Sequence, residues 1–242
     1  MILVGAFWLG GDALIVLFAV VSTLSLADFV AQDAVRGTYV DAACCYGCVL
    51  LQFGALAAGR LDLALVVLPL VATLAFPLLL LAQDGIYRFV ERAGERFWAV
   101  TACVYCLSHV PALLLLDGPA FEHRNAGLVA FVVAVALAAQ AMRSWRGSAS
   151  LVRVWVVRAV ALILLGDALA WMTPFTAPVA AALALATATM SWAGAFVLGR
   201  MRQERMTHAR ASGAIGRIAP RPDALVFAAP MFFYAVHAML AW

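Results

Sequence analysis

Arginines dominate the longest polar stretch of the chain, residues 200–222, which reads RMRQERMTHARASGAIGRIAPRP. Guanidinium groups bind phosphate through paired N–H donors, so the stretch suits a nucleotide or phospholipid phosphate, or else serves only to orient the chain in a membrane. Magnesium needs oxygen ligands such as carboxylates, yet the stretch holds one acid, Glu204, followed directly by Asp223. The pattern favours phosphate binding over metal chemistry. The six arginines are Arg200, Arg202, Arg205, Arg210, Arg217 and Arg221.

Two carboxylates, Asp12 and Asp167, lie inside strongly apolar segments. A charge near the centre of a bilayer costs at least a few kcal/mol, so such residues usually face the interior of a helix bundle and often mark function. Each is a candidate for a small transporter. The structural alternative is a carboxyl group that is protonated or lies at the membrane surface.

Further reactive side chains lie within or between apolar segments. The segment 143–153, RSWRGSASLVR, offers arginines and serines to a phosphate or to anionic lipid head groups. Ser108 and His109 are adjacent, so they point to different faces of a helix, which argues against a nucleophile–base pair. Two CxxC pairs could bind metal, but free cysteine usually packs as a small hydrophobe. The five cysteines are Cys44, Cys45, Cys48, Cys103 and Cys106.

The elements that position these residues are membrane helices. Hydrophobic residues make up 66% of the 242 residues and charged residues 12%, far from the composition of a soluble domain. Apolar runs of about 18 residues or more, enough to cross a bilayer, predict an all-α transmembrane bundle of eight spans in one membrane domain, 1–242. The predicted spans are 2–30, 40–59, 61–83, 97–116, 125–142, 151–172, 177–199 and 223–242.

Arginine placement predicts the orientation of this bundle. All 16 basic residues are arginine, which excludes a catalytic lysine. Thirteen arginines fall at the ends of spans one, three, five and seven, whereas Arg60 and Arg124 alone fall on the other side. Basic loops stay in the cytoplasm. We therefore expect a multi-pass protein of the bacterial inner membrane with cytoplasmic arginine-rich loops and both termini outside.

Three segments together resemble the phosphatidate cytidylyltransferase family, also called CDP-diacylglycerol synthases. They are CVYCLSHVPALLLLD (103–117), WMTPFTAPVAAA (171–182) and RPDALVFAAPMFFY (221–234). Their order and rough spacing are similar to the family's across residues 97–242. The resemblance implies a polytopic membrane enzyme of phospholipid biosynthesis. Its members use Mg²⁺ at a cytoplasmic site to convert CTP and phosphatidic acid into CDP-diacylglycerol and pyrophosphate.

The family's site residues carry over only in part. In its aspartate-arginine-x-aspartate element, Pro220 replaces the first acid and Asp223 keeps the second. The glycine-histidine-glycine-glycine element falls on 214–217, which contain no histidine. The serine-proline-x-lysine-threonine motif has no counterpart between Trp145 and Trp171. The resemblance thus implies Asp223 as the catalytic and Mg²⁺-binding residue.

The missing acids predict weak or no nucleotidyltransferase activity, because arginine cannot coordinate a cation. Arg200, Arg202, Arg217 and Arg221 are then the candidate phosphate-binding residues. Two functions stay open: a degraded cytidylyltransferase, or a non-catalytic membrane protein that binds anionic phospholipid or assists a partner. The expected partners are phosphatidic acid or another anionic lipid, CTP, and a second copy of the chain, with no nucleic acid.

Overall fold

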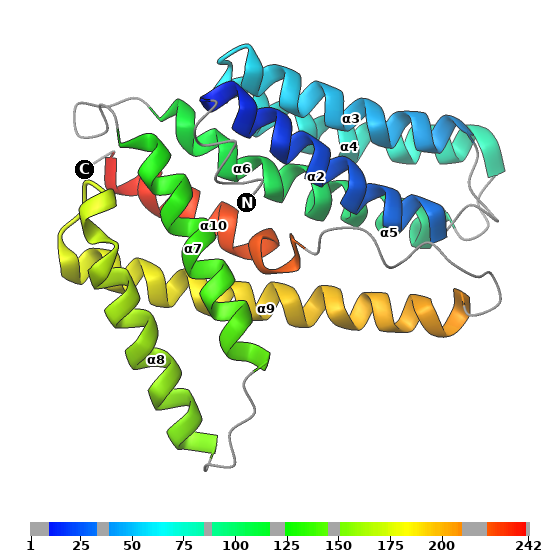
Figure 1. The fold of residues 1–242 in the computed structure, drawn as a ribbon. Helices are drawn as coiled ribbons and strands as arrows, with labels where there is room; N and C mark the ends of the chain where they lie inside the picture. Colours follow the sequence, from blue (N-terminus) through cyan, green and yellow to red (C-terminus); the bar gives the residue numbers. More distant parts are fainter. Residues whose placement is uncertain are drawn as a thin grey trace. The chain divides into compact units, whose positions relative to one another are not determined.

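The computed structural model describes residues 10–32, 39–84, 89–116, 124–144, 151–209 and 222–240 (Figure 1). Every regular element within these ranges is helical, which confirms the predicted all-α class. Each of the eight predicted spans contains a helix. The chain divides into two compact units, which are described separately: residues 1–111 with 203–222, and residues 112–202 with 223–242.

The first unit packs four helices and a composite continuation of the last one (Figure 1). Contacts are densest between consecutive helices, as expected for antiparallel neighbours joined by short connections. The elements are α2 (Gly11–Gln32), α3 (Tyr39–Ala57), α4 (Leu61–Asp84), α5 (Phe89–Val100), the π-helix η1 (Thr101–Cys106) and α6 (Leu107–Ala112).

A tight turn joins α3 to α4, as the Gly59–Arg60 pair predicts. Gly59 has a φ of 69°, a left-handed conformation that glycine adopts without a steric penalty. The Arg60 N–H donates to the Ala55 carbonyl at 2.9 Å and the Gly59 N–H to the Leu56 carbonyl at 3.0 Å. This pair of bonds is the Schellman arrangement that ends helices.

Proline inside α4 leaves a carbonyl that another helix satisfies. Pro69 has no N–H, so it cannot donate to the Leu65 carbonyl one turn earlier. The Tyr105 hydroxyl donates to that carbonyl at 3.1 Å. Membrane helices tolerate proline on this condition, and the contact also fixes η1 against α4.

The π-helix η1 keeps two polar pairs in register along α3. Arg96 pairs with Asp41 at 4.0 Å, and the Gln52 amide donates to Ser108 Oγ at 2.7 Å. These partners are 11 residues apart on α3 and 12 apart on the other chain segment. A π-helical turn holds more residues than an α-helical turn, so η1 absorbs the extra residue. The two segments therefore run parallel over about 16 Å.

The second unit contains four longer helices and three short 3₁₀ turns (Figure 1). Its elements are η2 (Leu113–Leu115), α7 (Asn125–Ser144), α8 (Leu151–Ala168), η3 (Ala170–Met172), α9 (Ala177–Ala209), η4 (Pro222–Ala224) and α10 (Leu225–Leu240). Helix α9 continues ten residues past the predicted end of its span. Residues 200–209 contain good helix formers and neither glycine nor proline, so the first half of the predicted loop is helical.

Small residues allow close helix contacts in this unit. A Cβ atom on Gly166 of α8 would lie 2.7 Å from the Ala184 Cβ and 2.8 Å from the Ala181 Cα. A Cβ on Gly194 of α9 would lie 2.9 Å from the Asp223 carbonyl oxygen. Such approaches are typical of membrane helices, which pack through small side chains.

Six helical segments are long and apolar enough to cross a membrane within the described ranges, and the chain is therefore a membrane protein. Of the remaining two predicted spans, α2 contributes a shorter apolar segment, Gly11–Ala27. Helix α8 carries three charged residues, Arg153, Arg158 and Asp167. The six segments are Tyr39–Ala57, Leu61–Leu79, Ala93–Leu115, Asn125–Arg143, Ala177–Met201 and Pro222–Met239.

Candidate functional site

Asp223 lies at the start of the last helix, where η4 leads into α10. It is 8% exposed. A carboxylate in the first turn of a helix is favoured by the free N–H groups and the dipole at that end. Its backbone oxygen lies against Gly194 of α9, where any larger side chain would collide with it. The chain therefore holds this acid in a closely packed position.

A second buried polar side chain lies one turn from Gly194. Ser191 is fully buried on α9, and its Oγ has no hydrogen-bond partner among the described residues. Residues three apart share a helix face, so Ser191 and Gly194 lie on the same side of α9. This face of α9 carries the closest contact with Asp223 and an available hydroxyl.

An arginine between two tryptophans occupies another part of the unit. The Arg158 Cζ lies 5.5 Å from the Trp155 ring centroid and 5.9 Å from that of Trp192. The two rings meet edge to face at 5.1 Å, and Trp192 Nε1 donates to the Ala139 carbonyl at 2.8 Å. Cation–π contacts operate within about 6 Å, so α8 and α9 both hold the Arg158 guanidinium.

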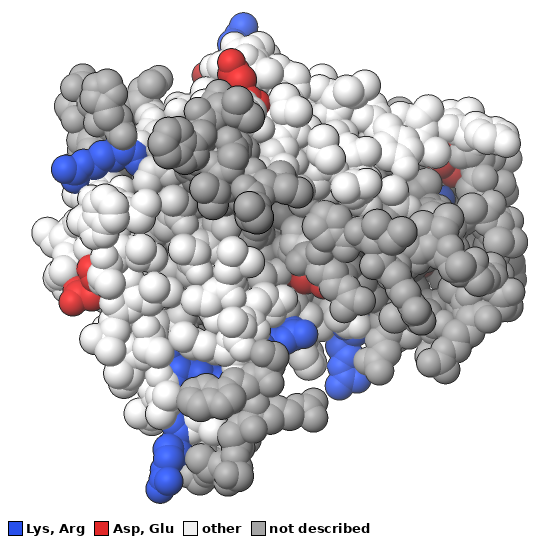
Figure 2. All heavy atoms as spheres, viewed as in Figure 1, with Lys and Arg blue, Asp and Glu red and all other residues white. Residues whose placement is uncertain are grey.

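Further arginines lie at the same end of this unit. Arg143 follows Ala139 by one turn on α7, and Arg153 precedes Arg158 on α8. Arg200 lies two turns beyond Trp192 on α9, with its Cζ 5.5 Å from the Phe196 ring. Arg143, Arg153 and Arg200 are exposed. Figure 2 shows basic side chains gathered at this end, over α8 and α9. We call Arg143, Arg153, Arg158 and Arg200 the basic end of the second unit.

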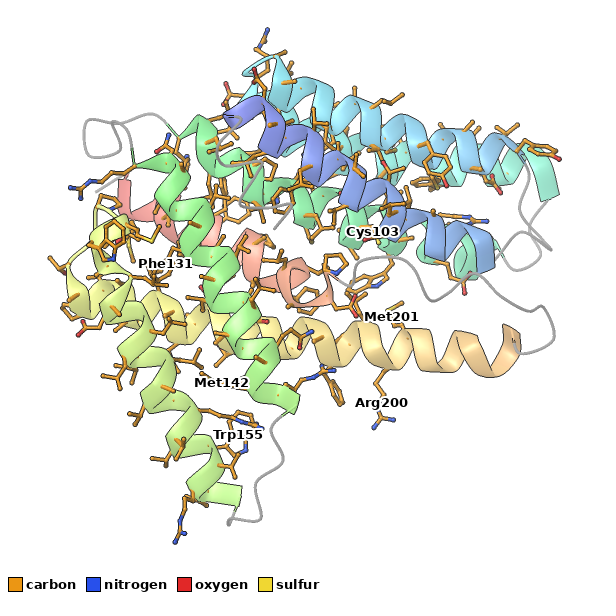
Figure 3. The ribbon with its side chains drawn as sticks, in the orientation of Figure 1. Cys103, Phe131, Met142, Trp155, Arg200 and Met201 are labelled. Carbon is orange, nitrogen blue, oxygen red and sulfur yellow. The ribbon has the colours of Figure 1, made fainter. Side chains whose placement is uncertain are left out.

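Asp223 and Arg200 are not adjacent. Gly194, which contacts Asp223, precedes Arg200 by six residues. That spacing corresponds to about 120° around the helix and about 9 Å along it. Figure 3 shows Arg200 and Met201 projecting from different sides of α9. The buried acid and the exposed guanidinium thus lie on different faces of α9.

The predicted phosphate-binding arginines are described only in part. Arg200 is placed as above, and the backbone of Arg202 continues α9. Arg217, Arg221 and the side chain of Arg202 lie outside the described residues. Their role remains a prediction.

The other candidates divide between exposed and buried positions. Asp12 and Asp167 are both exposed, so neither lies in the interior of its unit. Ser108 and His109 are buried, and both bond the Tyr105 carbonyl, at 2.7 and 2.8 Å. All five cysteines are free thiols, and four are buried. Residues 145–150, in the middle of the predicted 143–153 segment, lie outside the described residues.

Magnesium would have to bind through Asp223. No group of three or more histidine, cysteine or acidic side chains that could hold a metal occurs within the described ranges. The nearby side chains that the site offers are guanidinium groups and a hydroxyl, and guanidinium cannot coordinate a cation. The donor set described does not fit two magnesium ions, because a single carboxylate would have to serve both.

The sequence-based predictions missed the residues that hold Arg158. Trp155 precedes Arg158 by three residues, which places both on one face of α8, so that spacing was the available signal. Trp192 and Ala139 lie far from Arg158 in the sequence, and only the folded structure brings them together. The polar partners Asp41 and Gln52 of α3 were also missed.

No family model, curated protein or solved structure matches the chain.

Proposed function

We propose that this protein binds an anionic phospholipid head group at the basic end of its second unit. The observation that carries the proposal is the position of Arg158, an arginine within an apolar helix that two tryptophans hold in place. A guanidinium carries five N–H donors and pairs well with phosphate oxygens. The exposed Arg143, Arg153 and Arg200 add positive charge at the same end.

A membrane surface suits this arrangement. Tryptophan is enriched where the hydrocarbon meets the head groups, and arginine near a helix end extends its charged group to that boundary. Each basic residue close to an anionic surface contributes about 1 kcal/mol of attraction. A lipid phosphate at this depth would meet the guanidinium groups without leaving the bilayer.

The same placement accords with a topology of eight spans with both termini outside. In that topology α2 and α8 also cross the membrane, and the basic end faces the cytoplasm of a bacterial cell. Arg158 near the start of α8 would then lie close to the cytoplasmic surface, which lowers the cost of its charge. The positive-inside distribution of arginine supports this orientation.

Phosphatidic acid is the lipid that the resemblance favours. In this proposal the chain is a divergent relative of the phosphatidate cytidylyltransferases that keeps the binding of the lipid phosphate. Asp223 is the one acid of the family's pattern that remains, so binding without nucleotidyl transfer is the expected behaviour.

Phosphatidic acid should bind the purified protein in preference to phosphatidylcholine. A difference of about 1 kcal/mol corresponds to roughly a fivefold excess. Native mass spectrometry of the detergent-solubilised protein with both lipids would measure it. The excess should shrink as salt rises, because salt screens exposed charges. Equal adducts of the two lipids at low salt would contradict the proposal.

Cytidylyl transfer is the second candidate, and the buried position of Asp223 beside Gly194 favours it. The assay combines purified protein, labelled CTP, phosphatidic acid and magnesium. We expect lipid binding without CDP-diacylglycerol. If product does form, Asp223→Ala should reduce its rate by about 10²–10³-fold, as loss of one electrostatic group commonly does. The matched control is Asp62→Ala, since Asp62 is an exposed acid in the first turn of α4.

A further inference from the structure

The first unit has polar side chains inside it at several levels between α2, α3 and the composite helix α5–η1–α6. The Arg96–Asp41 pair lies at one level, and the Gln52–Ser108 bond lies about 16 Å away along α3. Between them Ser22 of α2 donates to the Cys103 carbonyl at 2.6 Å. These side chains are at most 6% exposed. Apart from Arg96 and Asp41, they carry no charge, so hydrogen bonds decide their stability.

Gln52 makes only part of the hydrogen bonds that its amide can form. Its Nε2 donates to Ser108, whose hydroxyl passes a hydrogen bond on to the Tyr105 carbonyl. Its Oε1 is buried and has no hydrogen-bond partner among the residues that the structure describes. Turning the amide over would exchange its oxygen and nitrogen and leave the nitrogen in that position instead. One polar atom of Gln52 needs a partner in either orientation.

Two further groups in this unit point to the same need. Ser25 is 1% exposed, and its Oγ also has no hydrogen-bond partner in the described part of the chain. Pro111 has no N–H, so the Leu107 carbonyl, next to Ser108, cannot receive the usual hydrogen bond from residue 111. A buried polar group without a partner costs about 1–3 kcal/mol. Buried water normally satisfies such groups by bonding two to four of them.

We infer that the first unit binds internal water, with one site at Gln52 and another at Ser25. At Gln52 a water molecule donates to the amide oxygen and has the Leu107 carbonyl as a second acceptor in the same region. At Ser25 a water molecule bonds the hydroxyl one turn along α2 from Ser22. Both sites lie in the interior of a membrane protein, where lipid offers no hydrogen bonds. The ligand is water rather than an ion, because neither site contributes a charge of its own.

Hydroxyl-radical labelling of the full-length protein in nanodiscs tests the inference. A brief X-ray pulse splits water where it is bound, and the radicals oxidise neighbouring thiols. Cys48 lies one turn from Gln52 and is 2% exposed, so bulk water would not label it. We expect Cys48 to be labelled in the wild-type protein, with the exposed Met239 as the internal reference. An unlabelled Cys48 beside a labelled Met239 would overturn the inference without any variant.

Variants then assign the water to Gln52. In Gln52→Leu the labelling of Cys48, relative to Met239, should fall at least threefold. In Thr73→Val, which changes an exposed hydroxyl of α4, it should stay unchanged. Undiminished labelling in a folded Gln52→Leu variant would overturn the assignment. If that variant does not fold, Gln52→Met offers a flexible side chain of similar length with no hydrogen-bonding amide, and the same readout decides.

Discussion

Replacing Asp41 by leucine will lower the free energy of unfolding by about 3–5 kcal/mol, the usual cost of removing one partner of a buried ion pair. Asp41 is 3% exposed and Arg96 is 6% exposed, so the remaining guanidinium would lose its carboxylate partner in a buried position. The pair also fixes the register of α5 on α3, because its partners differ by one residue from the Gln52–Ser108 pair. Unfolding in mixed micelles, followed by circular dichroism, measures the change.

The control for this effect is Asp62→Leu. Asp62 lies in the first turn of α4 as Asp41 lies in the first turn of α3, but it is exposed. Substitutions at such surface positions change stability by about 0.5 kcal/mol or less. The double variant Asp41→Leu with Arg96→Leu should recover much of the loss, since no buried charge then remains. Equal destabilisation by Asp41→Leu and Asp62→Leu would show that the pair is not buried.

The second large effect concerns lipid binding. Arg158→Gln should weaken the binding of phosphatidic acid about tenfold, because a hydrogen bond to a charged group contributes about 1.5–3 kcal/mol. Arg158→Lys keeps the charge but loses the planar fork and the stacking on Trp155 and Trp192, so its affinity should be intermediate. Dissociation constants from native mass spectrometry or from lipid titration in detergent would show both.

Arg60→Gln is the matched control for Arg158→Gln. Arg60 is the exposed arginine of the α3–α4 turn, far from the basic end in sequence and part of the first unit. It should leave the affinity for phosphatidic acid within twofold of wild type. Thermal unfolding of each variant must be compared first, since Arg158 also packs against two rings. A folded Arg158→Gln variant with wild-type affinity would remove Arg158 from the site.

The positions of the helices could be predicted because hydropathy depends on length and composition alone. The turn at Gly59 was also predictable, since glycine favours the left-handed conformation there. The role of Pro69 was predictable only in outline. The sequence requires a neighbour to satisfy the Leu65 carbonyl, but it does not indicate that Tyr105, 40 residues away, provides the hydroxyl.

The candidate site was harder to predict because its contacts join distant segments. Arg158 and Trp192 are 34 residues apart, and Asp223 meets Gly194 across a still longer separation. The sequence also placed Asp12 and Asp167 as candidates because both interrupt apolar runs. In the structure both are exposed, whereas the buried polar residues include Gln52 and Ser108, which a hydropathy pattern does not distinguish from their neighbours.

Lipid competition on the wild-type protein tests the central claim most directly. Equal amounts of phosphatidic acid and phosphatidylcholine of the same chain length are mixed with the purified protein, and adducts are counted by native mass spectrometry at low and high salt. We predict about a fivefold excess of phosphatidic acid at low salt that Arg158→Gln abolishes and Arg60→Gln preserves. Equal binding of the two lipids, or an excess that both variants retain, would contradict binding of a lipid phosphate at the basic end.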